Sequence, residues 1–337
     1  GVKVVRGISF SPDGRWLAAG MYDKVVLWDI STRQIVAELP VAKGAVSCLA
    51  FSPDGHTLAA GQTVGAIRIW DGSRGWTDAS ETALIQAPVI ERQKPGNLPE
   101  EREQVSQVVF SGDGELLAWS SGAPTSDYRV HFWKWRIREE VSVLPIGRVQ
   151  GDQRFQLNGN QLAVVVAGNR RPRSEAEIQV WVTAAAKLIH RVPVPAGPIG
   201  GVRFSPDGKL LAGTLWQGSG RQASPAELFL WDVATGKSVS FGRGPHRWLS
   251  VPAFSPDGRT LAVGTFSNPP PPCPSTVLLF DVATGRRREA FRSPQPGTAP
   301  WELAFSPDGQ YLAAGMAFDE VPVYLWRLSQ DASTDSS

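Results

Sequence analysis

The stretch Phe10–Gly20, "FSPDGRWLAAG", decides the fold because the chain repeats it. Five close copies begin at Phe51, Phe110, Phe204, Phe254 and Phe305. A degenerate copy, "FQLNGNQLAVV", begins at Phe155. In chain order the seven copies begin 41, 59, 45, 49, 50 and 51 residues apart. Internal repeats of this length are typical of propellers and solenoids.

Each copy predicts a β-hairpin followed by two more strands. In the Ser-Pro-Asp-Gly turn, proline presets φ and glycine accepts a positive φ, while apolar segments lie on both sides. A third segment rich in β-branched and aromatic residues has Trp or Phe as its second-last residue: "KVVLWD" (Lys24–Asp29), "AIRIWD" (Ala66–Asp71), "RVHFWK" (Arg129–Lys134), "EIQVWV" (Glu177–Val182), "ELFLWD" (Glu227–Asp232), "TVLLFD" (Thr276–Asp281) and "PVYLWR" (Pro322–Arg327). A weaker fourth strand follows, as at Ile35–Val41. Four short strands form one antiparallel blade, so the sequence predicts an all-β, seven-bladed propeller.

The combined pattern "FSPDG…LA.G…WD..TGK" resembles the WD-repeat β-propeller family, with repeats of the bacterial style, from Val5 to Leu328. The resemblance implies a single propeller over residues 1–328 and a polar C-terminal tail over 329–337. It also implies a non-catalytic protein-interaction scaffold or sensor module within a larger signalling or regulatory chain, because similar bacterial propellers often accompany kinase, NTPase or protease domains. A fold shared by so many functions does not identify the partner.

Composition limits the partner classes. The 337 residues carry a formal net charge of +2, which argues against nucleic acid as a partner. No apolar run approaches the length of a membrane span, and the two cysteines, Cys48 and Cys273, do not form a disulfide framework. We therefore expect a monomeric cytoplasmic propeller that binds a protein. The resemblance further implies a covalently linked domain upstream of Gly1.

Loop lengths distinguish the two ends of the blades. Most of the length variation lies between the second and third strands, and a long insertion, Ile90–Gln104, enters at the same end before the third blade. In an antiparallel meander this end is opposite to the Pro-Asp-Gly turns. We call it the decorated face and the turn-bearing end the plain face. Binding residues concentrate on loops held by a rigid scaffold, so the decorated face is the expected binding surface.

The candidate partner-binding residues lie around blades four to seven on the decorated face. Five are aromatic and three are basic: Trp216, Phe266, Phe318, Trp248, Trp301, Arg170, Arg171 and Arg221. Trp216, Phe266 and Phe318 are expected just after second strands, and Trp248 and Trp301 just before inner strands. Aromatic residues of this kind dominate interface energetics. The alternatives are that the aromatic side chains pack beneath the loops and that the arginines are simply solvated.

No catalytic residue, metal site or cofactor is expected. The aspartates of the turns occur once per blade, too far apart to share an ion, and a role in the turn explains them: Asp13, Asp54, Asp113, Asp207, Asp257 and Asp308. The four histidines lie in different repeats without zinc spacing: His56, His131, His190 and His246. The alternatives to a scaffold are a propeller enzyme of the lactonase or quinone-dehydrogenase type, and a nucleic-acid or glycan-binding module.

Two further expectations concern the blades themselves. Many WD repeats carry a Gly-His pair before the inner strand, and the histidine of that pair joins a buried polar network. The pair is missing here, which puts such networks in doubt.

The residues after "PVYLWRL" are polar and acidic, so blade seven is expected to have only three strands. The outer edge of its third strand would then be open to strand addition.

Overall fold

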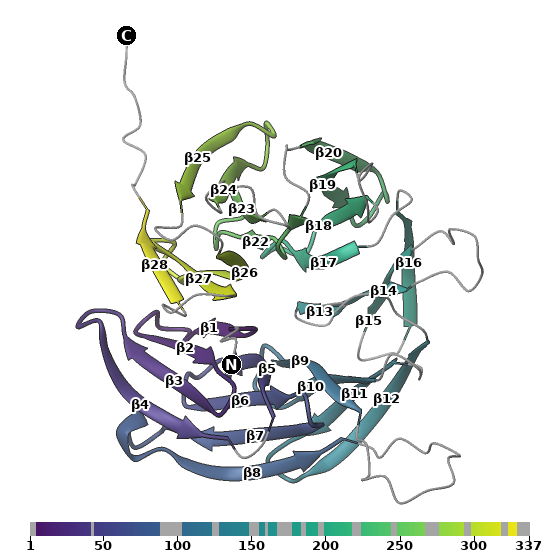
Figure 1. The fold of residues 1–337 in the computed structure, drawn as a ribbon. Helices are drawn as coiled ribbons and strands as arrows, with labels where there is room; N and C mark the ends of the chain where they lie inside the picture. Colours follow the sequence, from purple (N-terminus) through teal and green to yellow (C-terminus); the bar gives the residue numbers. More distant parts are fainter. Residues whose placement is uncertain are drawn as a thin grey trace, which may run out of the picture.

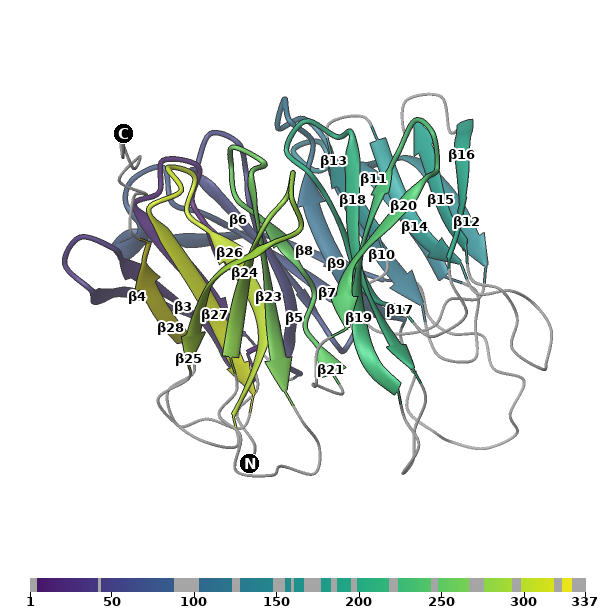
Figure 2. The same ribbon diagram turned by 90° about the horizontal axis from the view of Figure 1, so that it is seen from above.

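Seven antiparallel blades surround a common axis in the computed structural model (Figure 1). The structure describes residues 5–41, 44–87, 103–122, 128–147, 155–158, 161–166, 177–182, 187–194, 199–217, 224–243, 248–266, 276–292, 298–317 and 323–328. Seen from the side in Figure 2, the strands run between the two faces of the ring. The predicted all-β, seven-bladed propeller is confirmed.

The first four blades each have four strands in sequential order. Blade one contains β1 (Ile8–Phe10), β2 (Trp16–Gly20), β3 (Lys24–Asp29) and β4 (Gln34–Pro40). Blade two contains β5 (Val46–Phe51), β6 (Thr57–Gln62), β7 (Ala66–Asp71) and β8 (Ser80–Gln86), with the 3-10 turn η1 (Trp76–Asp78) before β8. Blade three contains β9 (Gln104–Phe110), β10 (Leu117–Gly122), β11 (Tyr128–Lys134) and β12 (Glu139–Gly147). Blade four contains β13 (Phe155–Asn158), β14 (Gln161–Val166), β15 (Glu177–Val182) and β16 (Lys187–Pro193).

The last three blades differ in strand number. Blade five contains β17 (Ile199–Phe204), β18 (Leu210–Gln217), β19 (Ser224–Asp232) and β20 (Ser238–Arg243). Blade six has its inner strand in two pieces and contains β21 (Trp248–Leu249), β22 (Ala253–Phe254), β23 (Thr260–Phe266), β24 (Thr276–Asp281) and β25 (Arg287–Arg292). In the described part of the chain, blade seven has three strands, as expected: β26 (Ala299–Phe305), β27 (Tyr311–Ala317) and β28 (Val323–Arg327). Among the described residues, no strand pairs with the outer side of β28.

The core lies between neighbouring blades, because one blade cannot bury both of its faces alone. Leu27 of blade one and Leu58 of blade two, for example, belong to one cluster and are fully buried. The ring is closed by a cluster that joins Ile8 and Phe10 of blade one to Ala313 of blade seven. The described part of the chain contains no helix with the length and apolar character needed to cross a membrane.

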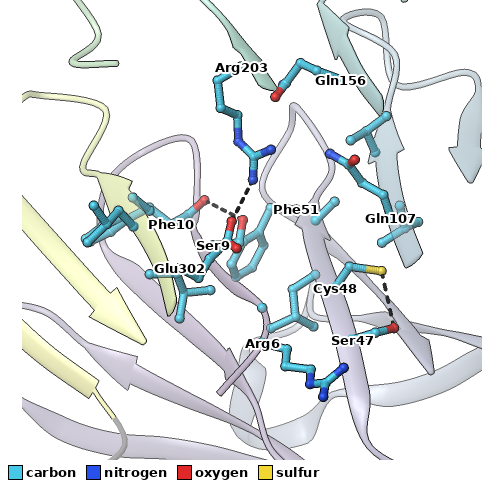
Figure 3. Close-up of a pocket in the computed structure, with 18 of the residues that line it drawn as sticks. Arg6, Ser9, Phe10, Ser47, Cys48, Phe51, Gln107, Gln156, Arg203 and Glu302 are labelled. Carbon is cyan, nitrogen blue, oxygen red and sulfur yellow. Dashed lines mark hydrogen bonds and ion pairs between the residues drawn. The ribbon is translucent and has the colours of Figure 1, made fainter. Parts of the chain in front are cut away.

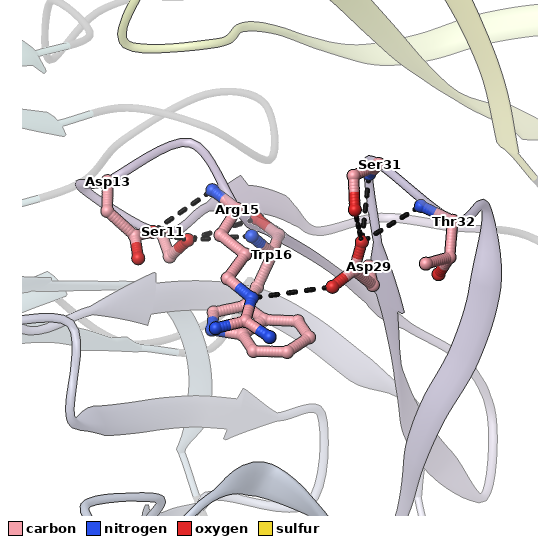
Figure 4. Close-up of polar contacts among 7 residues, drawn as sticks. All are labelled: Ser11, Asp13, Arg15, Trp16, Asp29, Ser31 and Thr32. Atoms are coloured by element: carbon pink, nitrogen blue, oxygen red, sulfur yellow. Dashed lines mark hydrogen bonds and ion pairs between the residues drawn. The ribbon is translucent and has the colours of Figure 1, made fainter.

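The repeated turn has the predicted geometry. Its final glycine has φ between 70° and 73° in all six close copies: Gly14, Gly55, Gly114, Gly208, Gly258 and Gly309. In the first copy, Ser11 Oγ donates to Asp13 Oδ1 at 2.5 Å and accepts from the Trp16 amide at 2.8 Å (Figure 4). The same serine–aspartate contact recurs in the other five close copies. The turn aspartates therefore act within their own turns.

One insertion has a structural role that the loop-length argument did not assign. Residues 72–79, between β7 and β8, form an enlarged turn on the plain face. Within them, Trp76 is 3% exposed and packs edge-to-face on Phe51, with 5.5 Å between ring centroids. It belongs to the core cluster between blades one and two. This part of the insertion is core rather than decoration.

Candidate functional site

The strand ends at the decorated face of blades five to seven carry four of the predicted aromatic residues. Trp248 and Phe266 are directly opposite each other in the β21–β23 ladder, at the decorated end of blade six. Trp216 is the second-last residue of β18. Trp301 lies in β26 at a register shift between Pro300 and Glu302, and its side chain is half-buried. All four were expected just outside the strands; they lie within the strand ends instead, because each ladder extends further than the apolar pattern indicated.

The other predicted site residues lie outside the described residues. These are Phe318 and the three arginines, Arg170, Arg171 and Arg221. Their role in binding stays a prediction, as does that of the four aromatic residues above.

A polar cavity of about 450 Å³ lies on the ring axis and was not predicted from the sequence. Inner strands of six blades line it, from β1, β5, β9, β13, β17 and β26. Figure 3 shows the Arg203 side chain of β17 reaching into this space toward Glu302 of β26. Arg203 Nη2 donates to Glu302 Oε1 at 2.7 Å, and the two side chains are 17% and 10% exposed. A charged residue inside an otherwise apolar inner strand was the available signal for each of them.

Cys48 of β5 also lines the cavity, and its chemistry is limited by burial. Burial raises the pKa of the Cys48 thiol to about 12, against a weaker opposing effect of the Ser47 hydroxyl. The thiolate is the reactive form of cysteine, so this side chain is inert near neutral pH.

Blade three contains a buried polar network. Ser121 of β10 contacts Glu103 through a short hydrogen bond to Oε2, and its Oγ lies 3.0 Å from Nε2 of His131 on β11. His131 Nδ1 lies 2.7 Å from Glu140 Oε1 on β12. Ser121, His131 and Glu103 are 0%, 3% and 4% exposed. The doubt about buried polar networks, raised by the missing Gly-His pair, was therefore wrong for this blade.

Blade two has polar residues at the same blade positions. Arg68 takes the place of His131: its Nε donates to Gln62 Oε1 at 3.2 Å, and its Nη1 donates to Glu81 at 2.5 Å. Glu81 lies opposite Trp70 just as Glu140 lies opposite Trp133. Sequence reasoning missed both networks because it searched for histidine before the inner strand, whereas here the basic residue is on the third strand.

The blade-three network has the order of nucleophile, base and acid that hydrolases use, but its serine is buried rather than open to a substrate. Ser121 Oγ, the His131 ring and the Glu140 carboxylate are in series at hydrogen-bond distances. Ser121 is fully buried, and Glu103 also contacts its hydroxyl. The Ser121 hydroxyl is therefore not exposed to solvent in this arrangement. Among the described residues, no group of three or more His, Cys, Asp or Glu side chains could hold a metal ion.

Comparison with known proteins supports the fold assignment. The family model described as WD domain, G-beta repeat, matches residues 2–29 and 33–71, which span the strands of blade one and the first three strands of blade two. No curated protein matches the chain significantly. The other blades repeat the matched hairpin, turn and third strand in register, and all seven close into one ring. The chain is therefore a seven-bladed β-propeller whose first two blades match the WD-repeat family.

Proposed function

We propose that this propeller is a non-catalytic protein-interaction scaffold or sensor module of a larger cytoplasmic signalling or regulatory protein, and that its partner binds the decorated face around blades four to seven. The observation that carries the proposal is the pairing of Trp248 with Phe266 at the decorated end of blade six. Trp216 of blade five and Trp301 of blade seven occupy the same end of the neighbouring blades.

Such a set suits a protein partner better than a small substrate. Large aromatic side chains at strand ends offer contact area at low entropic cost, and rigid strands hold their backbones in place. A bound protein would cover the strand ends of several blades at once, as interfaces of ordinary size require.

The test compares two variants of the whole chain as bait in a lysate of the source cells. The first carries Trp216→Ala, Trp248→Ala, Phe266→Ala and Trp301→Ala. The second carries Arg286→Ala and Arg287→Ala at an exposed turn of the plain face. Proteins captured by the wild type should be lost from the first bait and kept by the second, since an interface aromatic contributes about 2 kcal/mol or more.

Thermal unfolding of both baits separates loss of binding from loss of fold. If the decorated-face variant is folded and still captures the same proteins, the proposed surface is wrong. If both variants lose capture equally, the partner does not discriminate the two faces and the proposal fails.

A further inference from the structure

The blade-three network has more hydrogen-bond contacts than its groups have hydrogens to share in their ordinary protonation states. Ser121 Oγ contacts both Glu103 Oε2 and His131 Nε2, and His131 Nδ1 contacts Glu140 Oε1. Each of these three contacts needs one hydrogen between its heavy atoms. The serine hydroxyl has one, a neutral imidazole has one, and two ionised carboxylates have none. The third hydrogen must come from an additional proton on the imidazole or on a carboxyl group.

We propose that Glu103, Ser121, His131 and Glu140 form a proton-binding site that takes up one proton from solvent in mild acid and thereby completes its hydrogen bonds. The proton is shared between Glu103 and His131 through Ser121 Oγ. In one form the imidazole is doubly protonated and Ser121 donates to Glu103. In the other, the Glu103 carboxyl donates to Ser121, and Ser121 donates to a neutral imidazole. The two forms differ only in where the same hydrogens lie, so the group titrates as a unit.

The charges around His131 favour uptake of one proton. Among the described residues, the charged groups facing the network are Glu140 of β12, Glu103 before β9, and Arg129 of β11, whose Nη1 lies 3.6 Å from Glu103 Oε1. On the side of blade two, the shared core cluster is apolar, with Ile85 and Ala87 among its members. With the additional proton, two positive and two negative charges balance. Without it, the group carries an excess negative charge around the buried His131 and Glu103, although Glu140 and Arg129 are nearly half exposed, and an excess charge at a buried site is unfavourable.

Two further observations fit a cation at this position. The Trp119 ring stacks on the His131 ring at 3.9 Å between centroids and 8° between planes, and aromatic faces attract cations. In blade two, the permanently charged Arg68 occupies the position that His131 has in blade three. The two neighbouring blades thus share one design, with a fixed charge in one and a titratable charge in the other.

The site lies where the long insertion joins blade three. Glu103 immediately precedes β9, and Ser121 lies near the decorated end of β10. Burial lowers the pKa of the His131 imidazole below its ordinary value, while Glu140 and Glu103 oppose this effect. Proton uptake therefore occurs on the acid side of the usual histidine range. It strengthens the contact that holds the chain where it enters blade three, which goes beyond the proposed function in protein binding.

The experiment follows the ring nitrogens of His131 by NMR in the full chain from about pH 8 to about pH 4, a range that brackets the ordinary histidine pKa. The chain has four histidines, so the other three serve as internal references. Carbon-13 shifts of the Glu103 carboxyl group report the same proton if it resides there. The expected result is one proton taken up by the pair, with both signals changing at a common midpoint.

Glu103→Gln is the decisive variant. Because Arg129 faces Oε1, the carboxamide oxygen should face Arg129 and the carboxamide nitrogen should face Ser121, where it supplies the missing hydrogen permanently. The His131 midpoint should then fall by about one pH unit or more, a tenfold loss of proton affinity. Glu139→Gln, an exposed neighbour on β12, should leave the midpoint unchanged.

Ser121→Ala provides a second route if Glu103→Gln does not fold. Without the hydroxyl, Glu103 and His131 are no longer linked, so their midpoints should separate. The proposal is overturned if neither group binds a proton across the range while the chain stays folded. It is equally overturned if the His131 midpoint is the same in wild type and Glu103→Gln, or if the two signals share a midpoint in Ser121→Ala.

Discussion

Arg203 of blade five donates to Glu302 of blade seven across 2.7 Å, passing blade six altogether. Blade six is the one whose inner strand is split, into β21 and β22, with Ser250, Val251 and Pro252 between them. Proline has no N–H to donate to the ladder. Ser250 keeps this segment against β23 through two contacts of 2.8 Å with Gly264: the Ser250 amide donates to the Gly264 carbonyl oxygen, and Ser250 Oγ accepts from the Gly264 amide. The ion pair therefore joins the inner strands on either side of the interrupted one.

Loss of one partner of this pair should destabilise the ring. Arg203→Met is expected to lower the free energy of unfolding by about 2 to 3 kcal/mol, because the Glu302 carboxylate would stay in the cavity without its cation. Urea unfolding measures the difference. The double variant Arg203→Met with Glu302→Leu should lose less than the sum of the single variants.

The matched control is Lys24→Met, which breaks the exposed ion pair between Lys24 and Glu38 on blade one. Exposed pairs contribute about 0 to 1 kcal/mol. Equal effects of Lys24→Met and Arg203→Met would show that the axial pair has no special role in holding blades five and seven.

Local patterns explain what could be predicted from the sequence. Third strands such as Lys24–Asp29 and Thr276–Asp281 have the expected bounds because β-branched residues and a following turn specify them within a few residues. The turn glycines adopt the expected positive φ for the same reason. Seven such units of similar length leave a closed ring as the arrangement that buries both faces of every blade.

Contacts between distant repeats explain what could not be predicted. Arg203 and Glu302 are 99 residues apart, and nothing near either residue identifies its partner. Trp76 lies in an enlarged turn, and nothing near it in the sequence indicates burial, because it packs against Phe51 and blade one rather than against its own neighbours. The candidate partner-binding set was only located in part, since Phe318 and the three arginines lie outside the described residues.

Trp76 should be among the most sensitive positions of the chain. Trp76→Ala is expected to cost about 3 to 5 kcal/mol of unfolding free energy, because it leaves a cavity between blades one and two. Thr77→Ala, the exposed neighbour in η1, should change the stability by less than about 0.5 kcal/mol. Urea unfolding followed by far-UV circular dichroism compares them, and similar midpoints for the two variants would contradict the core role of Trp76.

A single replacement in the blade-three turn should stabilise the protein. Five of the six close copies have proline after serine, at Pro12, Pro53, Pro206, Pro256 and Pro307, whereas blade three has Gly112. The turn is otherwise the same, with the Gly114 amide donating to Ser111 O at 2.9 Å, and no atom lies within 4 Å of a Cβ placed at Gly112. Gly112→Pro should add about 0.4 to 1 kcal/mol by restricting the unfolded chain.

The control for this replacement lies two residues away. Gly114 has φ +73°, so Gly114→Ala should destabilise the chain by about 1 kcal/mol. Thermal unfolding ranks the three proteins. A lower melting temperature for Gly112→Pro than for the wild type would mean that this turn differs from the other five.

Asp29 should make stability depend on pH in the acid range. Its carboxylate accepts from Ser31 Oγ at 2.5 Å, from the Ser31 and Thr32 amides, and from Arg15 Nε at 3.4 Å (Figure 4). The Ser31 hydroxyl, followed by the Thr32 amide, lowers the pKa of Asp29 to about 2. A carboxyl group whose pKa is lower in the folded state stabilises the fold above its unfolded pKa, and that contribution is lost as pH falls through the folded value.

Asp29→Asn should therefore cost about 1 to 2 kcal/mol of unfolding free energy at neutral pH, and the difference from wild type should shrink as the pH falls from about 4 to about 2. Asp78→Asn, at the exposed end of η1, is the control and should change the stability by less than about 0.5 kcal/mol. Urea unfolding at several pH values measures the gap; a gap that stays constant or widens in acid would show that the hydrogen bonds to Asp29 do not depend on its charge.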